Sequence, residues 1–129
     1  MYNTILSALE TKLSNFATAQ GYEVAWPDIQ FSPNGSYLES FILPAETGQG
    51  GLSVGSYQEF EGIYQINVVT RKGNGTADSR AMVDAVLAEF SKGSMAGTLQ
   101  IQKSWASGSF DRDESYFVVP VSVRYKVYA

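Results

Sequence analysis

Residues 57–90 constrain the fold more than any other part of this sequence, because they predict a strand that turns directly into a helix. Alternate apolar residues are typical of a strand with one buried face, and here they are Phe60, Tyr64, Ile66 and Val68. The next apolar residues recur at steps of three and four, as on a helix with one apolar stripe; they are Met82, Val83, Val86, Leu87 and Phe90. Gly73-Asn74-Gly75 supplies a permissive backbone for the turn between them. A helix folded back over its own strand predicts two layers.

The other patterned segments complete these two layers. An apolar stripe predicts a first helix over residues 3–20, which Gly21 ends. Alternating or apolar runs predict further strands at 23–26, 37–43, 98–106 and 115–128. The predicted order is helix, three strands, helix, two strands. We therefore expect residues 1–129 to form a single domain with an α+β fold, in which two α-helices pack on one face of a mostly antiparallel β-sheet.

Two details of the last strands are also predicted. In the strand at 98–106, simple alternation places Leu99, Ile101, Lys103 and Trp105 on one face. In the strand at 115–128, Pro120 cannot donate a ladder hydrogen bond, so we expect a sheet edge or a bulge there.

Composition argues against several classes of function. The 129 residues contain no cysteine and no histidine, so the chain lacks the thiolate nucleophile, the commonest general base and the commonest ligands of transition metals. The formal charge of -4 provides no basic field for gripping phosphate backbones. No apolar run approaches the ~20 residues that a membrane span needs. We expect no enzyme activity, and no catalytic residue, cofactor, metal site, small-molecule substrate or membrane contact.

Two local patterns invite a chemical reading and fail on their spacing. The strand–turn–helix around residues 71–76 has neither glycine spacing of the nucleotide-binding loops, so a plain connection is favoured. The acidic turn at 111–114 lacks the further ligands of a calcium loop, so a solvated turn is favoured.

Two segments are suited to contacts between proteins. The strand at 37–43 is apolar on both faces, so we expect helices to cover one face and another subunit the other. Residues 45–56 include four glycines and predict a flexible loop that orders against a partner, the alternative being a solvated linker. Adjacent Arg71 and Lys72 suit an acidic partner surface. The candidate interface residues are Tyr37, Phe41, Leu52, Val54, Arg71 and Lys72.

Three segments, taken in order, resemble a known family. They contain Trp26-Pro27-Asp28 through Ile42-Leu43-Pro44-Ala45, then Gly62-Ile63-Tyr64-Gln65-Ile66-Asn67-Val68 with Gly73-Asn74-Gly75 and a helix to Phe90, and last Tyr116-Phe117-Val118-Val119-Pro120-Val121-Ser122-Val123-Arg124-Tyr125. Their combination is similar to the tail terminator proteins of long-tailed bacteriophages, also called tail completion or minor tail proteins. The resemblance covers about residues 4 to 127. One departure is that Arg71-Lys72 stand where the family pattern suggests a proline.

The resemblance implies a structural role in the virion. Such a subunit assembles into a homohexameric ring at the head-proximal end of the tail, after synthesis in the host cytoplasm. The ring stops polymerisation of the tail tube protein and gives the head-completion or connector protein a docking surface, and DNA passes through without sequence-specific binding. Two alternatives stay open: another head–tail joining protein, such as a head-closure or minor capsid component, and a small ligand-binding domain.

A further hypothesis concerns the hole of such a ring. If Glu39, Glu59 and Glu61 face it, six copies produce an acidic lining. Such a lining repels phosphates and lets DNA slide without sticking.

Overall fold

The computed structural model describes residues 2–26, 36–44, 59–72, 77–97, 99–112 and 116–128. The elements, in chain order, are α1 (Tyr2–Gln20), β1 (Glu23–Ala25), β2 (Tyr37–Pro44), β3 (Glu59–Arg71), α2 (Ala77–Glu89), β4 (Met95–Ala96), β5 (Leu99–Ala106), β6 (Phe110–Asp111) and β7 (Tyr116–Tyr128). The described strands form one sheet of order β1-β2-β3-β7-β5-β4, with β6 paired to β7. β1 and β2 run parallel, and the other pairs are antiparallel. The α+β prediction is confirmed.

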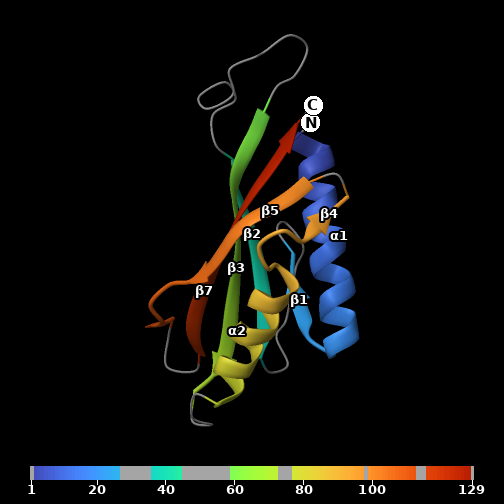
Figure 1. Cartoon of the computed structure of the whole chain (residues 1–129). Helices are drawn as coiled ribbons and strands as arrows, with labels where there is room; N and C mark the ends of the chain where they lie inside the picture. The colour runs from blue at the N-terminus through green and yellow to red at the C-terminus, as the bar shows by residue number, and fades with distance from the viewer. Residues whose placement is uncertain are drawn as a thin grey trace.

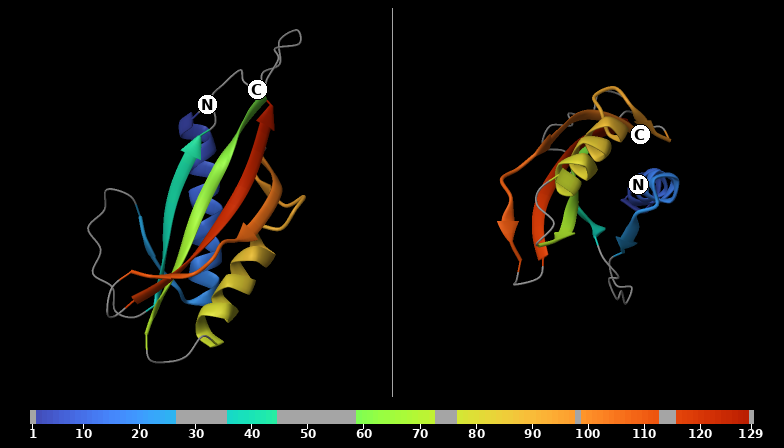
Figure 2. Two further views of the ribbon diagram at one scale, coloured as in Figure 1. Left: turned by 90° about the vertical axis from the view of Figure 1, so that its left-hand side faces the viewer. Right: turned by 90° about the horizontal axis from the view of Figure 1, so that it is seen from below.

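Both helices lie within the curl of the sheet, on one face of it (Figures 1 and 2). The alternating apolar residues of the strands and the apolar stripes of the helices both lie in this core, because each pattern marks the buried side of its element. The helices contribute Leu9, Leu13, Val86 and Phe90, and the central strands contribute Tyr64, Ile66, Val68, Val121, Val123 and Tyr125. α1 ends as predicted at Gly21, whose φ is 77°, and the Tyr22 N–H donates to the Ala17 carbonyl at 2.8 Å.

Two features of the strand order and strand lengths differ from the sequence-based expectation. β4 and β6 are not predicted, because strands of two residues are too short to show a periodic pattern. β7 is an interior strand, so the expectation of a sheet edge at Pro120 is wrong. The Pro120 carbonyl accepts from the Ser107 N–H at 2.8 Å, and Ser107 lies between β5 and β6. The proline nitrogen therefore faces the gap between those two strands, where no ladder donor is needed.

A β-bulge in β5 overturns the simple alternation expected for residues 98–106. The pairing of β5 with β7 shifts register between Ile101 and Lys103, so Gln102 is the extra residue. Ile101 pairs with Tyr125 and is buried under the helices, whereas Lys103 pairs with Arg124. Lys103 and Trp105 therefore lie on the opposite face from Leu99 and Ile101. The bulge moves a cation and an aromatic ring onto the side of the sheet that the helices do not cover.

The buried hydroxyl of Tyr64 makes the stability of the folded protein depend on pH. Its ring is fully buried, and neither its hydroxyl nor that of Ser40 has a hydrogen-bond partner in the described structure. Burial is the main cause that raises the pKa of Tyr64 well above the ordinary value of 10.0. Above that ordinary value the unfolded chain releases the Tyr64 proton while the folded protein retains it, so the free energy of unfolding falls as pH rises.

We expect Tyr64→Phe to weaken this alkaline loss of stability. At neutral pH the variant should unfold within about 1 kcal/mol of the original protein, because the removed hydroxyl has no partner. Urea unfolding at neutral pH and at several values above 10 measures both effects. Parallel stability curves for the two proteins would contradict the assignment.

Candidate protein-contact surface

The outer face of the sheet, which is the side opposite the helices, is built from cross-strand rows of side chains. Residues directly opposite each other in a ladder point to the same face, so the strand register defines these rows. One row is Leu43, Ile63, Arg124 and Lys103, and the next is Phe41, Gln65, Ser122 and Trp105. The left panel of Figure 2 looks onto this face, with β2, β3 and β7 in front of the helices.

One end of the outer face is closed by the chain's own residues. Val69 and Val118 are fully buried there, and Tyr37 is nearly so, although all three point away from the helices. The Tyr37 ring packs edge-on against Tyr116, with ring centroids 5.8 Å apart. Arg112, just after β6, donates to both carboxylate oxygens of Glu39. We call this region the closed end.

Electrostatics reinforce the closed end. The Arg112 guanidinium also donates to the Tyr37 hydroxyl at 3.2 Å, and the Asn67 amide donates to Glu39 at 3.3 Å. The hydrogen bonds from Arg112 to Glu39 raise the pKa of the guanidinium above its ordinary value. Burial is the main cause that raises the pKa of Tyr37, and the Glu39 carboxylate adds to the rise. The Glu39 carboxylate is thus paired with a cation of the same chain.

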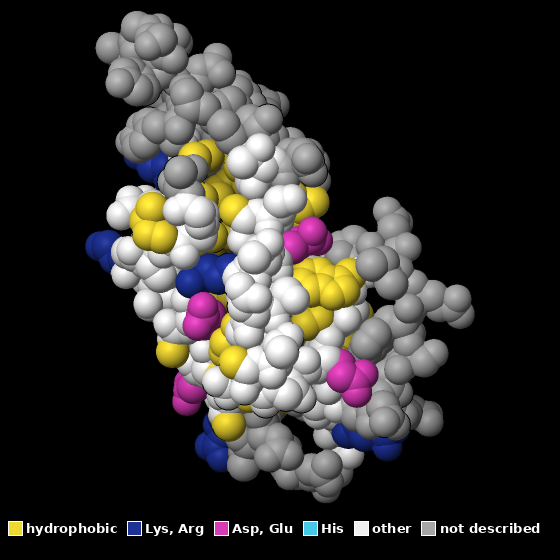
Figure 3. Space-filling view, turned by 90° about the vertical axis from the view of Figure 1, so that its right-hand side faces the viewer, with side chains coloured by type: hydrophobic (Ala, Val, Ile, Leu, Met, Phe, Trp, Pro, Cys, Tyr) yellow, Lys and Arg dark blue, Asp and Glu magenta, His cyan; other side chains and the backbone are white. Residues whose placement is uncertain are grey.

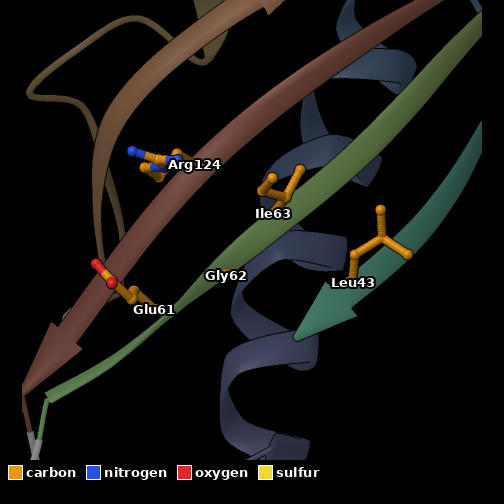
Figure 4. A pocket seen from close by; sticks show the side chains of 5 residues that line it. All are labelled: Leu43, Glu61, Gly62, Ile63 and Arg124. Atoms are coloured by element: carbon orange, nitrogen blue, oxygen red, sulfur yellow. The ribbon is translucent and has the colours of Figure 1, made fainter. Parts of the chain in front are cut away.

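The other end of the outer face is exposed, and we call it the open end; it consists of Phe41, Leu43, Ile63, Lys103 and Arg124. Phe41 and Leu43 are 45% and 52% exposed. A hollow of 260 Å³ beside them is lined by Leu43, Glu61, Gly62, Ile63 and Arg124. Figure 4 shows Leu43, Ile63 and Arg124 rising from β2, β3 and β7 on the side away from α1. β1 pairs only with residues 37–39 of β2, so the rest of β2 has no strand on that side among the described residues.

Cations gather at the open end. Arg124 lies directly opposite Lys103 on β5, and like charges in this position destabilise a sheet. Lys126 follows on the same face of β7, opposite Glu61 on β3. The Lys103 ammonium lies over the Trp105 ring, 5.3 Å from its centroid. The helix-bearing side differs, because cations and carboxylates are dispersed there, as Figure 3 shows; Lys12 and Glu89 form an ion pair of 3.1 Å between the two helices.

The structure separates the predicted interface residues. Tyr37 is buried at the closed end and Phe41 is exposed at the open end. Arg71 lies over the Tyr116 ring at 6.0 Å, and Lys72 forms an ion pair of 3.3 Å with Asp111. Leu52 and Val54, with the rest of the glycine-rich loop, lie outside the described residues. Roles for all six in an interface stay predictions.

The three predicted lining carboxylates also have different surroundings. Glu39 is bound to Arg112, and Glu61 is exposed beside Arg124. Glu59 begins β3, and its side chain lies outside the described residues. An acidic lining built from these residues stays a prediction.

The sequence-based list of candidate interface residues did not include Leu43, Ile63, Lys103 or Arg124. A signal existed for Leu43, which shares its parity with Tyr37 and Phe41 in an apolar strand. The face of the sheet on which Lys103 lies depends on the bulge, and no residue type in that strand indicates a bulge.

Chemically, the open end offers apolar and cationic groups for binding rather than groups for a reaction. Within the described ranges, no set of three or more acidic, histidine or cysteine side chains is placed to hold a metal ion. Neither described helix has the length and apolarity to cross a membrane.

Comparisons with known proteins agree on the fold and on a family. The family model described as phage tail terminator protein matches residues 4–125. One solved structure matches with a TM-score of 0.76 and 26% sequence identity, covering 98% of this chain and 95% of the other. A chain from the virion of a native gene transfer agent particle matches with a TM-score of 0.62 and 16% identity, covering 95% and 93%. A search of curated proteins found no significant match.

Proposed function

Because this chain belongs to the phage tail terminator family, and is thereby a structural protein of bacteriophage tails, we propose that it forms a hexameric ring on the head-proximal end of the tail tube. The ring stops polymerisation of the tube protein and provides the surface on which the head-side connector docks. DNA passes through the ring during ejection. The family match over residues 4–125 is the observation that carries this proposal.

The surface of the protein supports a role that depends on contacts with other proteins. The open end of the outer face exposes Phe41 and Leu43 side by side with the hollow at Ile63. Large apolar side chains that gather on a surface mark sites of protein contact. At the closed end of the same face, by contrast, Val69, Val118 and Tyr37 are buried within the chain itself.

The proposal predicts the phenotype of phage that lack this protein. Without a terminator, the tube protein keeps adding to the growing end, so tails should vary in length and extend beyond the normal length. These tails should also lack heads, because the docking surface is missing. Negative-stain electron microscopy of lysates measures tail length and the fraction of tails joined to heads.

Complementation provides the control. The original protein supplied from a plasmid should restore uniform tails with heads. A variant with Leu43→Asp, which places a charge on the open end, should restore neither or only one of the two properties. Tails of normal length joined to heads in the absence of the protein would overturn the proposed function.

A further inference from the structure

We propose that the open end of the outer face is the surface through which one copy of this chain binds the next copy. The open end consists of Phe41, Leu43, Ile63, Lys103 and Arg124. This inference rests on the proposed ring and adds to it the face of the subunit that makes the contact. The group that binds there from the next copy is an apolar side chain flanked by carboxylates.

The apolar half of the open end has the form of a receiving site. The structure describes four large hydrophobic side chains as exposed, and two of them, Phe41 and Leu43, lie on one face of β2. The hollow next to Leu43 has Ile63 on its wall, and the small Gly62 follows between Ile63 and Glu61 along β3. An apolar side chain seated there would remove Leu43 and Ile63 from water, which stabilises the contact.

Charge favours a second copy as the occupant. Lys103, Arg124 and Lys126 share this face with the exposed carboxylate of Glu61. The net charge of the whole chain is -4, so the remaining surface of a neighbouring copy is more acidic than that net charge indicates. A carboxylate from the neighbour between Lys103 and Arg124 would relieve the repulsion between two cations that face each other across the ladder. Complementary charge of this kind selects and orients a partner.

The same features disfavour the DNA backbone as the occupant. Phosphates would gain nothing from Phe41, Leu43 and Ile63, and Glu61 on the wall of the hollow would repel them. The inference also assigns Glu61 to a contact between subunits, which excludes it from an acidic lining of the hole.

The geometry of the contact agrees with a ring. A basic and apolar surface that binds an acidic surface elsewhere on the next copy makes a heterologous contact, in which the two partners use different patches. Repetition of such a contact closes into a ring when the rotation per subunit is right. An isologous contact, in which the open end meets itself, would bring Arg124 and Lys103 of two copies together and be repelled.

The absence of cysteine permits a direct test by site-specific cross-linking. Leu43→Cys, labelled with a benzophenone maleimide, places a photoreactive group at the open end. Thr11→Cys, labelled in the same way, is the control, because Thr11 is exposed on α1 on the other side of the molecule. Both variants are incorporated into tails, irradiated and separated by mass. Leu43→Cys should give an adduct of two copies of this 14.1 kDa chain, in a yield about tenfold above that of Thr11→Cys.

Each outcome of this experiment has a distinct meaning. An adduct between two copies supports the inference. An adduct with the tube protein, the connector protein or DNA, or a yield no higher than that of the control, overturns it and leaves the proposed function intact. Absence of this protein from the tails overturns the proposed function itself.

Charge reversal tests the electrostatic part separately. Lys103→Glu combined with Arg124→Glu should lower the yield of the two-copy adduct by about tenfold, because carboxylates would then face the acidic surface of the neighbour. Thermal unfolding of the reversed variant, which also loses the contact between Lys103 and the Trp105 ring, checks that it remains folded. An unchanged yield would show that charge does not guide the contact.

Discussion

Replacing Phe90 with alanine is expected to lower the free energy of unfolding by about 4 kcal/mol, the range typical of large-to-small changes in a core. Phe90 is fully buried just after α2, its ring centroid lies 6.4 Å from that of Tyr64, and the Lys12 ammonium lies 5.5 Å from it. The substitution removes packing between the helical layer and β3. A loss of this size shifts the midpoint of thermal unfolding by on the order of 15 °C, which differential scanning calorimetry measures.

Phe110 provides the matched control for this prediction. It is the same residue type, but it lies on β6 and is 50% exposed. Phe110→Ala should change the free energy of unfolding by less than about 0.5 kcal/mol. Equal losses for Phe90→Ala and Phe110→Ala would show that the core between α2 and β3 does not dominate stability.

The second large effect is expected from Arg112→Ala, which should cost about 2 kcal/mol of unfolding free energy. The substitution leaves the Glu39 carboxylate, whose side chain is only 17% exposed, with the Asn67 amide as its remaining donor at 3.3 Å. A largely buried carboxylate that loses its cation is costly, because it retains the penalty of desolvation. Chemical denaturation with urea measures the loss.

A double-mutant cycle separates this ion pair from general effects of the substitution. Arg112→Ala combined with Glu39→Ala should be less destabilised than the sum of the two single variants, because the unpaired charge is then absent. Lys72→Ala is the surface comparison, since its ion pair with Asp111 involves a carboxylate side chain that is 71% exposed. That variant should lose at most about 0.5 kcal/mol. Strict additivity for Arg112 and Glu39 would contradict the coupling.

The sequence predicted the layers of this fold because its longest elements carry strong periodic patterns. The predicted ends of α1, β3 and β7 and the predicted C-terminal end of α2 lie within two residues of the observed ones. Tyr64, Ile66 and Val68 lie on the helix side of β3, as their alternation indicated. Short strands leave no such pattern, so β4 and β6 were missed, and so was the parallel pairing of β1 with β2.

The contact surface was less predictable, because it depends on pairings between distant parts of the chain. Arg112 and Glu39 are 73 residues apart, and no local pattern joins them. From its sequence Tyr37 is expected to be an exposed interface residue, but Arg112 and Tyr116 pack against it. Lys103 and Trp105 read as core-facing until one extra residue turns them outward. In each case the long-range register of the sheet, and not the residue type, decides which side chains reach the surface.

On the side of β7 away from β3, two separate strands pair with it, one on each side of Pro120. β5 pairs with residues 121–126 of β7, whereas β6 pairs only with Val118 and Phe117. Between the two regions the Ser107 N–H donates to the Pro120 carbonyl, so β6 and Arg112, which follows it, stay joined to β7 next to β5. The outer face is therefore closed at one end by a strand of two residues and Arg112, while the longer pairing of β5 with β7 borders the end where Phe41 and Leu43 are exposed.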